Sequence, residues 1–273
     1  MRRLFLLCIS ILCIGVAAAN ESESKIVMKA VKSSMNFTAI EVNNPISVII
    51  EQRTEGNIII RATEKMMPHI QISVSGNKLT ISSDIKQFNM QNASPIAEVY
   101  IPYNGKLNSF ESTAVSSIDV QPFISVNTLD IECVGASRIS LKAKAVKAEV
   151  EVAGAAGVKA EIECTTMDAT VAGAATLTLS GSATTAEIEV AGASTLKAED
   201  FTCSQLDASV VGASKATVSG NKADIEAVGA SSVSVECSTE LTAPAVGASS
   251  IRYTGECQVN ILDNIGASSI KKR

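Results

Sequence analysis

The chain has 273 residues, of which 46% are apolar and 3% aromatic, with no Trp and a single His. Charged residues make up 19%, which argues against a disordered polyelectrolyte, and the apolar content is enough for a sizeable core. The formal charge of −5 argues against a nucleic-acid-binding protein, which needs a basic surface. One His and seven Cys at no metal-ligand spacing argue against a zinc site.

The first residues predict a signal peptide over 1–19. Arg2 and Arg3 form a basic start, residues 4–16 form an apolar run too short to span a bilayer, and small residues lead up to Ala19. Cleavage after Ala19 leaves 21 basic and 28 acidic residues, a net charge of −7. No other stretch is apolar enough for a membrane span. We therefore expect export to a periplasmic, cell-surface or extracellular location.

Residues 20–110 read as a β-rich capping and first-turn region. Ser75-Gly76-Asn77 has the composition of a turn between two strands. A solenoid needs capped ends because an open terminal strand recruits other chains, and we expect this region to cover the first end. The expected strands span 26–31, 37–42, 46–51, 57–63, 70–75 and 78–82.

A Gly-Ala pair recurs about every 19 residues from residue 135 onward. The intervals between its glycines are 19, 19, 19, 20, 17, 18 and 19 residues, and Ala114 takes the glycine place in a degenerate copy 21 residues upstream. A fixed period of this length is typical of a solenoid, so we expect 111–273 to form regular β-solenoid repeats. The glycines expected at structural corners are Gly135, Gly154, Gly173, Gly192, Gly212, Gly229, Gly247 and Gly266.

Within each repeat the hydrophobic pattern has a period of two, as in residues 129–134 (Leu-Asp-Ile-Glu-Cys-Val). Ala, Glu and Lys favour helix by propensity, but strict alternation with β-branched residues favours strand. Because a strand advances about 3.3 Å per residue, 19 residues must turn corners, and three faces of roughly six residues would close one turn. The sequence predicts an all-β fold, a single-stranded parallel β-helix in the form of a three-sided solenoid.

Glycine allows the positive φ or close backbone approach that a tight corner needs. Alanine follows all eight corner glycines, and we expect its methyl group to point into a cramped vertex. The serines that come next are expected to point outward, where they either hydrogen-bond between turns or form a flat hydroxyl-rich binding face. These serines are Ser137, Ser194, Ser214, Ser231, Ser249 and Ser268.

Four cysteines share one position in the repeat. Cys164, Cys203 and Cys257 lie nine residues before a corner glycine and Cys237 lies ten before, which predicts an inward column of small side chains. Cys237 and Cys257 fall in adjacent turns, so a bridge between them is one alternative. Buried free thiols are the favoured one, since the exported chain has an odd number of cysteines.

Several segments resemble the head GIN domain family of auto-transporter adhesins. They are residues 37–42 (Phe-Thr-Ala-Ile-Glu-Val), 46–50 (Ile-Ser-Val-Ile-Ile), 77–81 (Asn-Lys-Leu-Thr-Ile) and the later Gly-Ala-Ser-Ser-Ile steps. The resemblance implies a right-handed parallel β-helix in a secreted or cell-envelope protein with an adhesive role. It carries over no catalytic residues. The chain has Asn44-Pro45 where the family often has glycine.

Carboxylates recur five and three residues before the corner glycines, which predicts two columns on one outer face about 4.8 Å apart per turn. A solvated face is the favoured interpretation. The alternatives are a Ca²⁺ site, since Ca²⁺ takes six to eight oxygen ligands, and a surface for a cationic partner. The weak calcium candidates are Asp130, Glu132, Glu149, Glu151, Asp168, Glu187, Glu189, Asp207, Asp224 and Glu226.

Parallel β-helices also host enzymes that act on polysaccharides, which need carboxylates in a cleft. Short regular turns predict no long loops to build a cleft, and scarce aromatics remove sugar-stacking platforms. His69 reads as an ordinary loop or strand residue, and the repeats contain no His for a catalytic triad. We expect no catalytic residues and no cofactor.

The sequence as a whole predicts an exported, non-enzymatic β-solenoid, an adhesin or a structural or binding protein of the cell envelope. A carbohydrate-active β-helix enzyme and a calcium-stabilised binding module are the alternatives. A cell-surface glycan or a matrix protein is the expected kind of partner, and nucleic acid is not.

Overall fold

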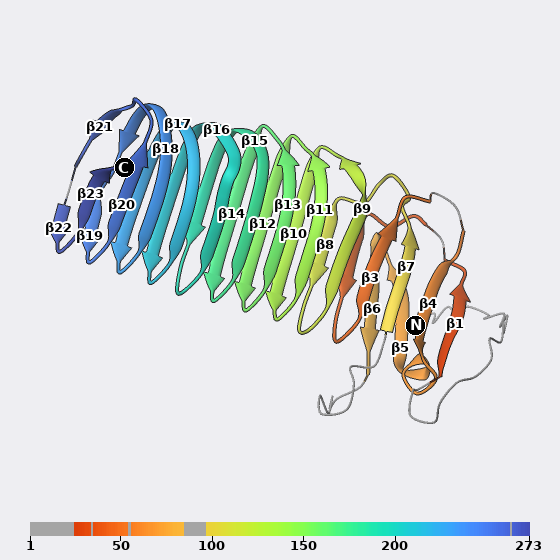
Figure 1. Ribbon diagram of the computed structural model, residues 1–273. Coiled ribbons are helices and arrows are strands. Elements are labelled where there is room, and N and C mark those ends of the chain that lie inside the picture. The colour runs from red at the N-terminus through yellow and green to blue at the C-terminus, as the bar shows by residue number, and fades with distance from the viewer. Residues whose placement is uncertain (1–24, 34, 54–55, 85–96, 263) are drawn as a thin grey trace.

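The protein is an elongated β-solenoid of about nine turns, with the strand Ile26–Val31 near one end and the strand Ser269–Lys272 near the other (Figure 1). This computed structural model describes residues 25–33, 35–53, 56–84, 97–262 and 264–273. The predicted signal peptide, 1–19, lies outside the described residues. The all-β class and the repeating solenoid predicted from the Gly-Ala period are confirmed.

Between Thr128 and Gly173 each turn consists of two strands rather than the three faces expected. β10 (Thr128–Gly135) is followed by β11 (Arg138–Lys144), and β12 (Lys147–Gly154) returns to lie parallel to β10. β13 (Gly157–Glu163) lies parallel to β11 in the same way. Two strands of seven or eight residues and two short corners use the whole repeat, so no third face is needed.

The strands stack into two sheets that face each other across the core, here called the acidic sheet and the opposite sheet. In stacking order the acidic sheet contains β5 (Ile70–Ser75), β6 (Lys78–Ser83), β2 (Ala39–Val42), β8 (Ser109–Ser112), β10, β12 and β14 (Thr166–Gly173). The opposite sheet contains β1 (Ile26–Val31), β4 (Ile58–Thr63), β7 (Ala97–Pro102), β3 (Ser47–Glu51), β9 (Ser117–Ser125), β11 and β13.

The later strands are longer and run through the corner opposite the Gly-Ala pairs, so that each contributes to both sheets. These strands are β15 (Thr176–Val190), β16 (Thr195–Gly212), β17 (Lys215–Gly229) and β18 (Ser232–Thr242). The final turns contain β19 (Ala245–Gly247), β20 (Ser250–Thr254), β21 (Gln258–Asn260), β22 (Asn264–Gly266) and β23 (Ser269–Lys272).

The N-terminal region continues the same two sheets. β2 pairs in parallel with β8, and β3 with β9, so residues before the regular repeats belong to the same stack. Antiparallel pairs β1–β4, β4–β7 and β5–β6 complete this end, with a 3-10 turn at Met67–His69. The six strands expected here are present as β1 to β6, with ends that differ by at most two residues.

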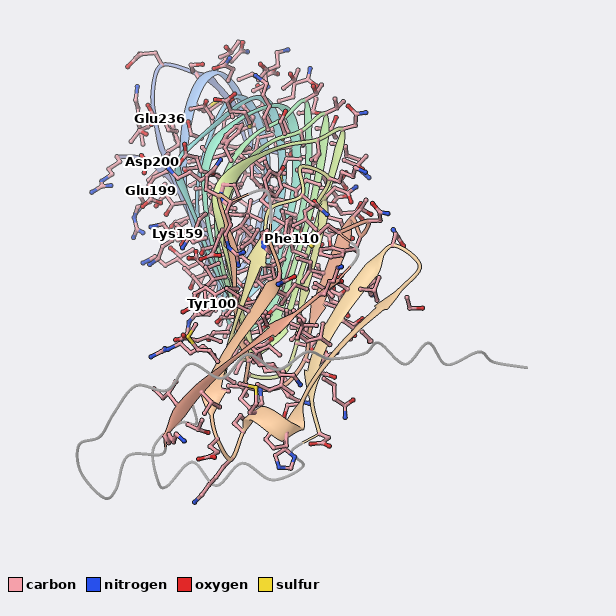
Figure 2. The ribbon with its side chains drawn as sticks, turned by 90° about the vertical axis from the view of Figure 1, so that its right-hand side faces the viewer. Tyr100, Phe110, Lys159, Glu199, Asp200 and Glu236 are labelled. Atoms are coloured by element: carbon pink, nitrogen blue, oxygen red, sulfur yellow. The ribbon has the colours of Figure 1, made fainter. Side chains whose placement is uncertain are left out.

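Alternating side chains fill one continuous core between the sheets. From Lys147 to Val152 in β12 every second residue is buried, and the residues between them are exposed. Phe37, Phe110 and Phe201 are fully buried along the length of the stack, and the rest of the core is mostly Ile, Val, Leu and Ala. Figure 2 shows Phe110 inside the body of the solenoid. The period-two pattern therefore predicted the buried positions correctly.

The corner assignment of the repeat glycines is confirmed. All eight have φ between +84° and +89°, a region that side chains with a Cβ rarely adopt. Ala114 has φ +61°, as expected for a degenerate copy, and Asn44 has φ +71° one turn earlier. Asn tolerates this conformation better than most residues, so Asn44 occupies a corner without glycine.

The alanine after each corner glycine is exposed, so the prediction of an inward methyl group was wrong. The N–H of Ala155 donates to the carbonyl of Gly135 in the preceding turn at 2.7 Å, which directs the Ala155 side chain to solvent. The residue after it then points inward. The exposed alanines are Ala136, Ala155, Ala174, Ala193, Ala213, Ala230, Ala248 and Ala267.

The serines that follow these alanines point into the core, so the prediction that they point outward was also wrong. Ser137, Ser194, Ser214, Ser231 and Ser249 are buried, and Ser268 is half-buried at the last corner. Five of these six hydroxyls donate to the carbonyl three residues earlier, as Ser194 does to Ala191 at 2.8 Å. The corner hydrogen-bonding role is therefore right, and a hydroxyl-rich binding face does not form.

The predicted thiol column is present at the other corner. Ala183, Cys203, Gly220 and Cys237 are successive partners in the parallel ladders. All five cysteines that the structure describes are free: Cys133, Cys203 and Cys237 are buried, and Cys164 and Cys257 are half-buried. Burial raises the pKa of the Cys164 and Cys203 thiols to about 11, so both are protonated at neutral pH.

A candidate binding face on the acidic sheet

The structure stacks the predicted carboxylates into two columns on the outer face of the acidic sheet. The first column, in register from turn to turn, is Asp130, Glu149, Asp168, Glu187, Asp207 and Asp224. The second is Glu132, Glu151, Thr170, Glu189, Ser209 and Glu226. Since every one of these residues lies at an outward position of its strand, the ten carboxylates share one surface.

The second column extends beyond the residues predicted for it. Glu111 on β8 is the ladder partner of Glu132, and Glu41 on β2 is the partner of Glu111. The sequence contained this signal, because Glu111 and Glu41 stand three residues before Ala114 and Asn44. Both were missed because these corners carry no glycine.

One cation offsets part of the charge of this extension. The Lys78 ammonium lies 2.8 Å from a Glu111 carboxylate oxygen and 3.2 Å from a Glu41 oxygen. Burial alone would raise the pKa of Glu41, but hydrogen bonds from Asn43 and Lys78 and the Lys78 charge hold it below its usual value. This end of the face is therefore an ion-pair network.

Further along, the carboxylates repel one another. Burial, followed by the charges of Glu111, Glu151 and Asp130, raises the pKa of Glu132. Burial, followed by the charges of Asp207 and Glu226, raises the pKa of Asp224. Neighbouring turns are about 4.8 Å apart, close enough for like charges to disfavour ionisation even in water. The face thus has an unbalanced negative charge that a cationic group could relieve.

A third column of side chains lies beside the first and was missed by the sequence analysis. Its members stand seven residues before the corner glycines: Lys147, Thr166, Thr185, Gln205, Lys222 and Glu240. The repeat register could have identified them, but their mixed chemistry gave no pattern to recognise. Lys147 lies 3.3 Å from Glu149, and Lys222 lies 3.6 Å from Glu240.

The first and third columns together line a groove of about 430 Å³. Its middle is formed by Asp168, Glu187, Asp207 and Asp224 on one side and by Thr166, Thr185 and Gln205 on the other, with a lysine near each end. The groove therefore offers carboxylate, hydroxyl, amide and ammonium groups at the regular spacing of the turns. This volume is in the range of small-ligand sites, although the groove is open to solvent.

The carboxylate columns do not converge as metal ligands must. Within the described part of the chain, no group of three or more His, Cys, Asp or Glu side chains has an arrangement that could hold a metal ion. Ladder neighbours project side by side from a sheet, whereas Ca²⁺ needs oxygens directed at one point. The geometry favours diffuse attraction of cations over a chelating site.

The outer face of the opposite sheet is different in character. Lys159, Lys197 and Arg252 share one column there with hydroxyl residues. A smaller depression of about 120 Å³ is lined by Glu199, Glu236, Arg252 and Arg273, among others. Figure 2 labels Lys159, Glu199, Asp200 and Glu236 along this side of the solenoid. Mixed charges at this depression allow local pairing and leave no net field.

His69, the single histidine, lies in the N-terminal 3-10 turn. Its Nδ1 atom is 2.7 Å from a carboxylate oxygen of Asp84, and both side chains are about half exposed. It lines neither the acidic groove nor the smaller depression. The described residues that line the groove and the smaller depression form no catalytic arrangement with His69.

Within the described ranges, no helix has the length and apolar character needed to cross a bilayer.

Comparisons with known proteins agree with this architecture. A putative adhesin from Parabacteroides distasonis superposes with a TM-score of 0.68 at 17% identity, covering 92% of this chain and 98% of that one. A putative adhesin from Parabacteroides merdae gives 0.68 at 18%, covering 91% and 96%. A protein from Parabacteroides distasonis named a putative lipid binding protein gives 0.66 at 18%, covering 91% and 96%. These likenesses show a shared fold.

No curated protein matches the chain. A family model described as "Putative auto-transporter adhesin, head GIN domain" matches residues 36–237, which include the N-terminal strands from β2 onward and most of the regular turns. The segments 37–42, 46–50 and 77–81, which resemble this family, lie within the matched range, and the Gly-Ala-Ser-Ser-Ile steps at 247–251 and 266–270 lie beyond it. Since the match covers well over half of the sequence, the protein belongs to the head GIN domain family.

Proposed function

We propose that this protein is an exported, non-enzymatic adhesive module that contacts its ligand through the groove of the acidic sheet. The observation that carries the proposal is the groove itself, where two columns of outward side chains repeat turn after turn. A rigid repeating surface suits a partner that is extended or that has many contact points, because weak contacts add along its length.

The charge of the groove favours one kind of partner. Four carboxylates in its middle are balanced by lysines only at its ends. An anionic polymer would be repelled, whereas a neutral glycan can accept and donate hydrogen bonds there, and a basic segment of a matrix protein gains electrostatic attraction. Neutral cell-surface glycans and basic matrix proteins are therefore the proposed partners.

Export is supported by the signal-peptide pattern of residues 1–19 and agrees with the family of adhesins. The non-enzymatic character is supported by the construction of the groove. Its carboxylates form evenly spaced ladders, and catalysis by a carboxylate pair needs one acid and one base in different environments facing a single bond. Asp168, Glu187 and Asp207 occupy equivalent positions instead.

The test is binding to arrayed neutral glycans, acidic glycans and matrix proteins by three forms of the protein. Asp207→Asn with Asp224→Asn removes two charges from the groove without changing side-chain size. The matched control, Glu199→Gln with Asp200→Asn, removes two charges from the opposite sheet, which Figure 2 shows. We expect the groove variant to lose at least tenfold in affinity for the ligand found and the control to lose less than twofold.

Two results would overturn the proposal. One is binding that the control abolishes and the groove variant retains, which would place the contact surface on the opposite sheet. The other is release of new chain ends from any arrayed polysaccharide, with the groove variant inactive, which would make the protein an enzyme.

A further inference from the structure

The C-terminal turns place two cysteines in stacked segments of adjacent turns. β18 pairs with β20 through Glu236 and Thr254, and with β21 through Glu240 and Gln258, so the segments between these pairs lie one above the other. Cys237 and Cys257 lie in those two segments. Burial, followed by the proximity of the Cys257 thiol, raises the pKa of Cys237, and both side chains pack on the same core.

No other pair among the five described cysteines is placed in this way. Ala183 separates Cys164 from Cys203 in the column, and Gly220 separates Cys203 from Cys237. Cysteines two turns apart are about 10 Å from each other, beyond the range of Cα separations that a disulfide allows. Cys133 lies at the glycine corner, where its sulfur is 3.2 Å from the Ser137 hydroxyl. Position alone therefore selects one pair.

We infer that Cys237 and Cys257 are an oxidation site, which forms a disulfide in an oxidising compartment and staples the last turns of the solenoid. The reaction with a small-molecule disulfide is balanced in two exchanges. One cysteine thiolate attacks the small disulfide, forms a mixed disulfide and releases one small thiol. The second cysteine then attacks the mixed disulfide and releases the other, so two S–H bonds and one S–S bond are replaced by a new S–S bond and two small thiols.

Exposure sets the order of the two steps. Cys257 is half-buried, so an oxidant reaches it first. Cys237 is buried, and its sulfur lies 3.0 Å from the carbonyl oxygen of Glu240 and 3.3 Å from that of Asn221. A thiol enclosed among carbonyl oxygens is a poor first nucleophile, but it is already placed to attack a neighbouring mixed disulfide. Cys257 therefore reacts first and Cys237 resolves the intermediate.

The staple would act where the solenoid is weakest. β21 and β22 have three residues each, and the final turns expose Ile261, Leu262 and Ile265. Short terminal strands with exposed apolar side chains open more easily than the central turns. A covalent link between β18 and the segment before β21 closes a loop of about 20 residues, which restricts the unfolded chain and opposes fraying.

The test incubates the folded full chain with oxidised glutathione, blocks the remaining thiols, and maps the linked peptides by mass spectrometry. We expect one linked pair, Cys237 with Cys257, and a thermal midpoint several degrees above that of the reduced protein, reversed by dithiothreitol. In Cys257→Ser the link and the shift are lost, and in the matched control Cys164→Ser both remain. The wild-type peptide map needs no variant, so a folding defect in either variant leaves the test intact.

Three outcomes would overturn the inference. They are the absence of any protein disulfide after incubation, a link that uses Cys133, Cys164 or Cys203 in place of the named pair, and a Cys237–Cys257 link that leaves the thermal midpoint unchanged. The last of these would show that the bond forms but does not staple the end.

Discussion

A Cβ atom on Gly192 would lie 2.7 Å from the carbonyl oxygen of Gly173, the same oxygen that accepts a 2.7 Å hydrogen bond from the N–H of Ala193. The relationship repeats along the stack, because a Cβ on Gly173 would lie 2.8 Å from the Gly154 oxygen. Each corner glycine from Gly154 onward thus needs its own positive φ and is also packed against the glycine of the turn before it. Two independent constraints explain why the residue recurs so strictly.

Replacing a corner glycine should destabilise the solenoid severely. Gly192→Val places a branched side chain at φ +86° and against the Gly173 backbone, which cannot move without disturbing its hydrogen bond to Ala193. We expect a loss of several kcal/mol in the free energy of unfolding, since backbone strain alone costs about 1–3 kcal/mol. Urea unfolding followed by far-UV circular dichroism measures it.

Gly157 provides the matched control for this prediction. It lies on β13 with no positive φ, and an added Cβ would meet its nearest atom, the Thr176 oxygen, at 3.9 Å. Gly157→Ala should therefore change stability by less than about 1 kcal/mol and can be stabilising. Equal losses in Gly192→Val and Gly157→Ala would contradict the corner assignment.

The two residues after a corner glycine should tolerate charge very differently. Ala193→Lys places an ammonium group in solvent, so we expect the free energy of unfolding to change by about 0.5 kcal/mol or less. Ser194→Lys buries the same group in the core and should prevent folding or cost several kcal/mol. Thermal unfolding of both variants measures the difference, and the reverse order would restore the inward-alanine arrangement.

The Ser194 hydroxyl itself should contribute modestly to the free energy of unfolding. Ser194→Ala removes its hydrogen bond to the Ala191 carbonyl, which is worth about 1 kcal/mol. Ala156 and Ala175 occupy the equivalent buried position in two other turns, so a methyl group fits there. A loss above about 3 kcal/mol would mean that the hydroxyl does more than cap its own corner.

Removing a carboxylate charge from the groove should stabilise the protein at neutral pH. The pKa of Asp224 is raised in the folded state, so folding favours its protonated form. Its contribution is fully present below pH 3.8, its ordinary value, and is lost as pH rises through the folded pKa. Asp224→Asn should therefore gain about 0.5 kcal/mol or less at neutral pH, because solvent screens the repulsion. Urea titrations at neutral pH and below pH 3.8 measure the gain and its disappearance.

Removing the charge of Glu41 should change the free energy of unfolding with the opposite sign. Its pKa is lowered in the folded state by Asn43 and Lys78, so its stabilisation is present above pH 4.5 and lost as pH falls through the folded pKa. Glu41→Gln should accordingly destabilise at neutral pH and have no effect in acid. Effects of the same sign in Glu41→Gln and Asp224→Asn would contradict the electrostatic account of the acidic sheet.

Divalent cations should act on the acidic sheet without chemical selectivity. Because its carboxylates stand in ladders and do not converge, Ca²⁺ and Mg²⁺ at equal millimolar concentrations should raise the thermal midpoint by the same small amount. Differential scanning calorimetry with each ion and with EDTA measures this. A rise of several degrees with Ca²⁺ alone would reveal a calcium site and revive that alternative.

Much of this molecule follows from local repetition in the sequence. The Gly-Ala period located the turns from Gly135 onward, and the alternation within each repeat identified the buried positions and both carboxylate columns. These features are predictable because a strand has a side-chain period of two, and because identical turns must stack in register to pair their backbones.

The tertiary structure alone decided the number of faces, the direction of the corner side chains, and which columns meet in a groove. The number of faces depends on how the corners bend: the turns from β10 to β14 have two strands each, where three faces were expected. At a corner the positive φ of Gly192 breaks the alternation, sending Ala193 out and Ser194 in, and no composition pattern records that direction. The groove arises where Lys147, Thr166 and Thr185 come together from different turns, because contacts between turns are set by the stacked backbone and not by neighbours in sequence.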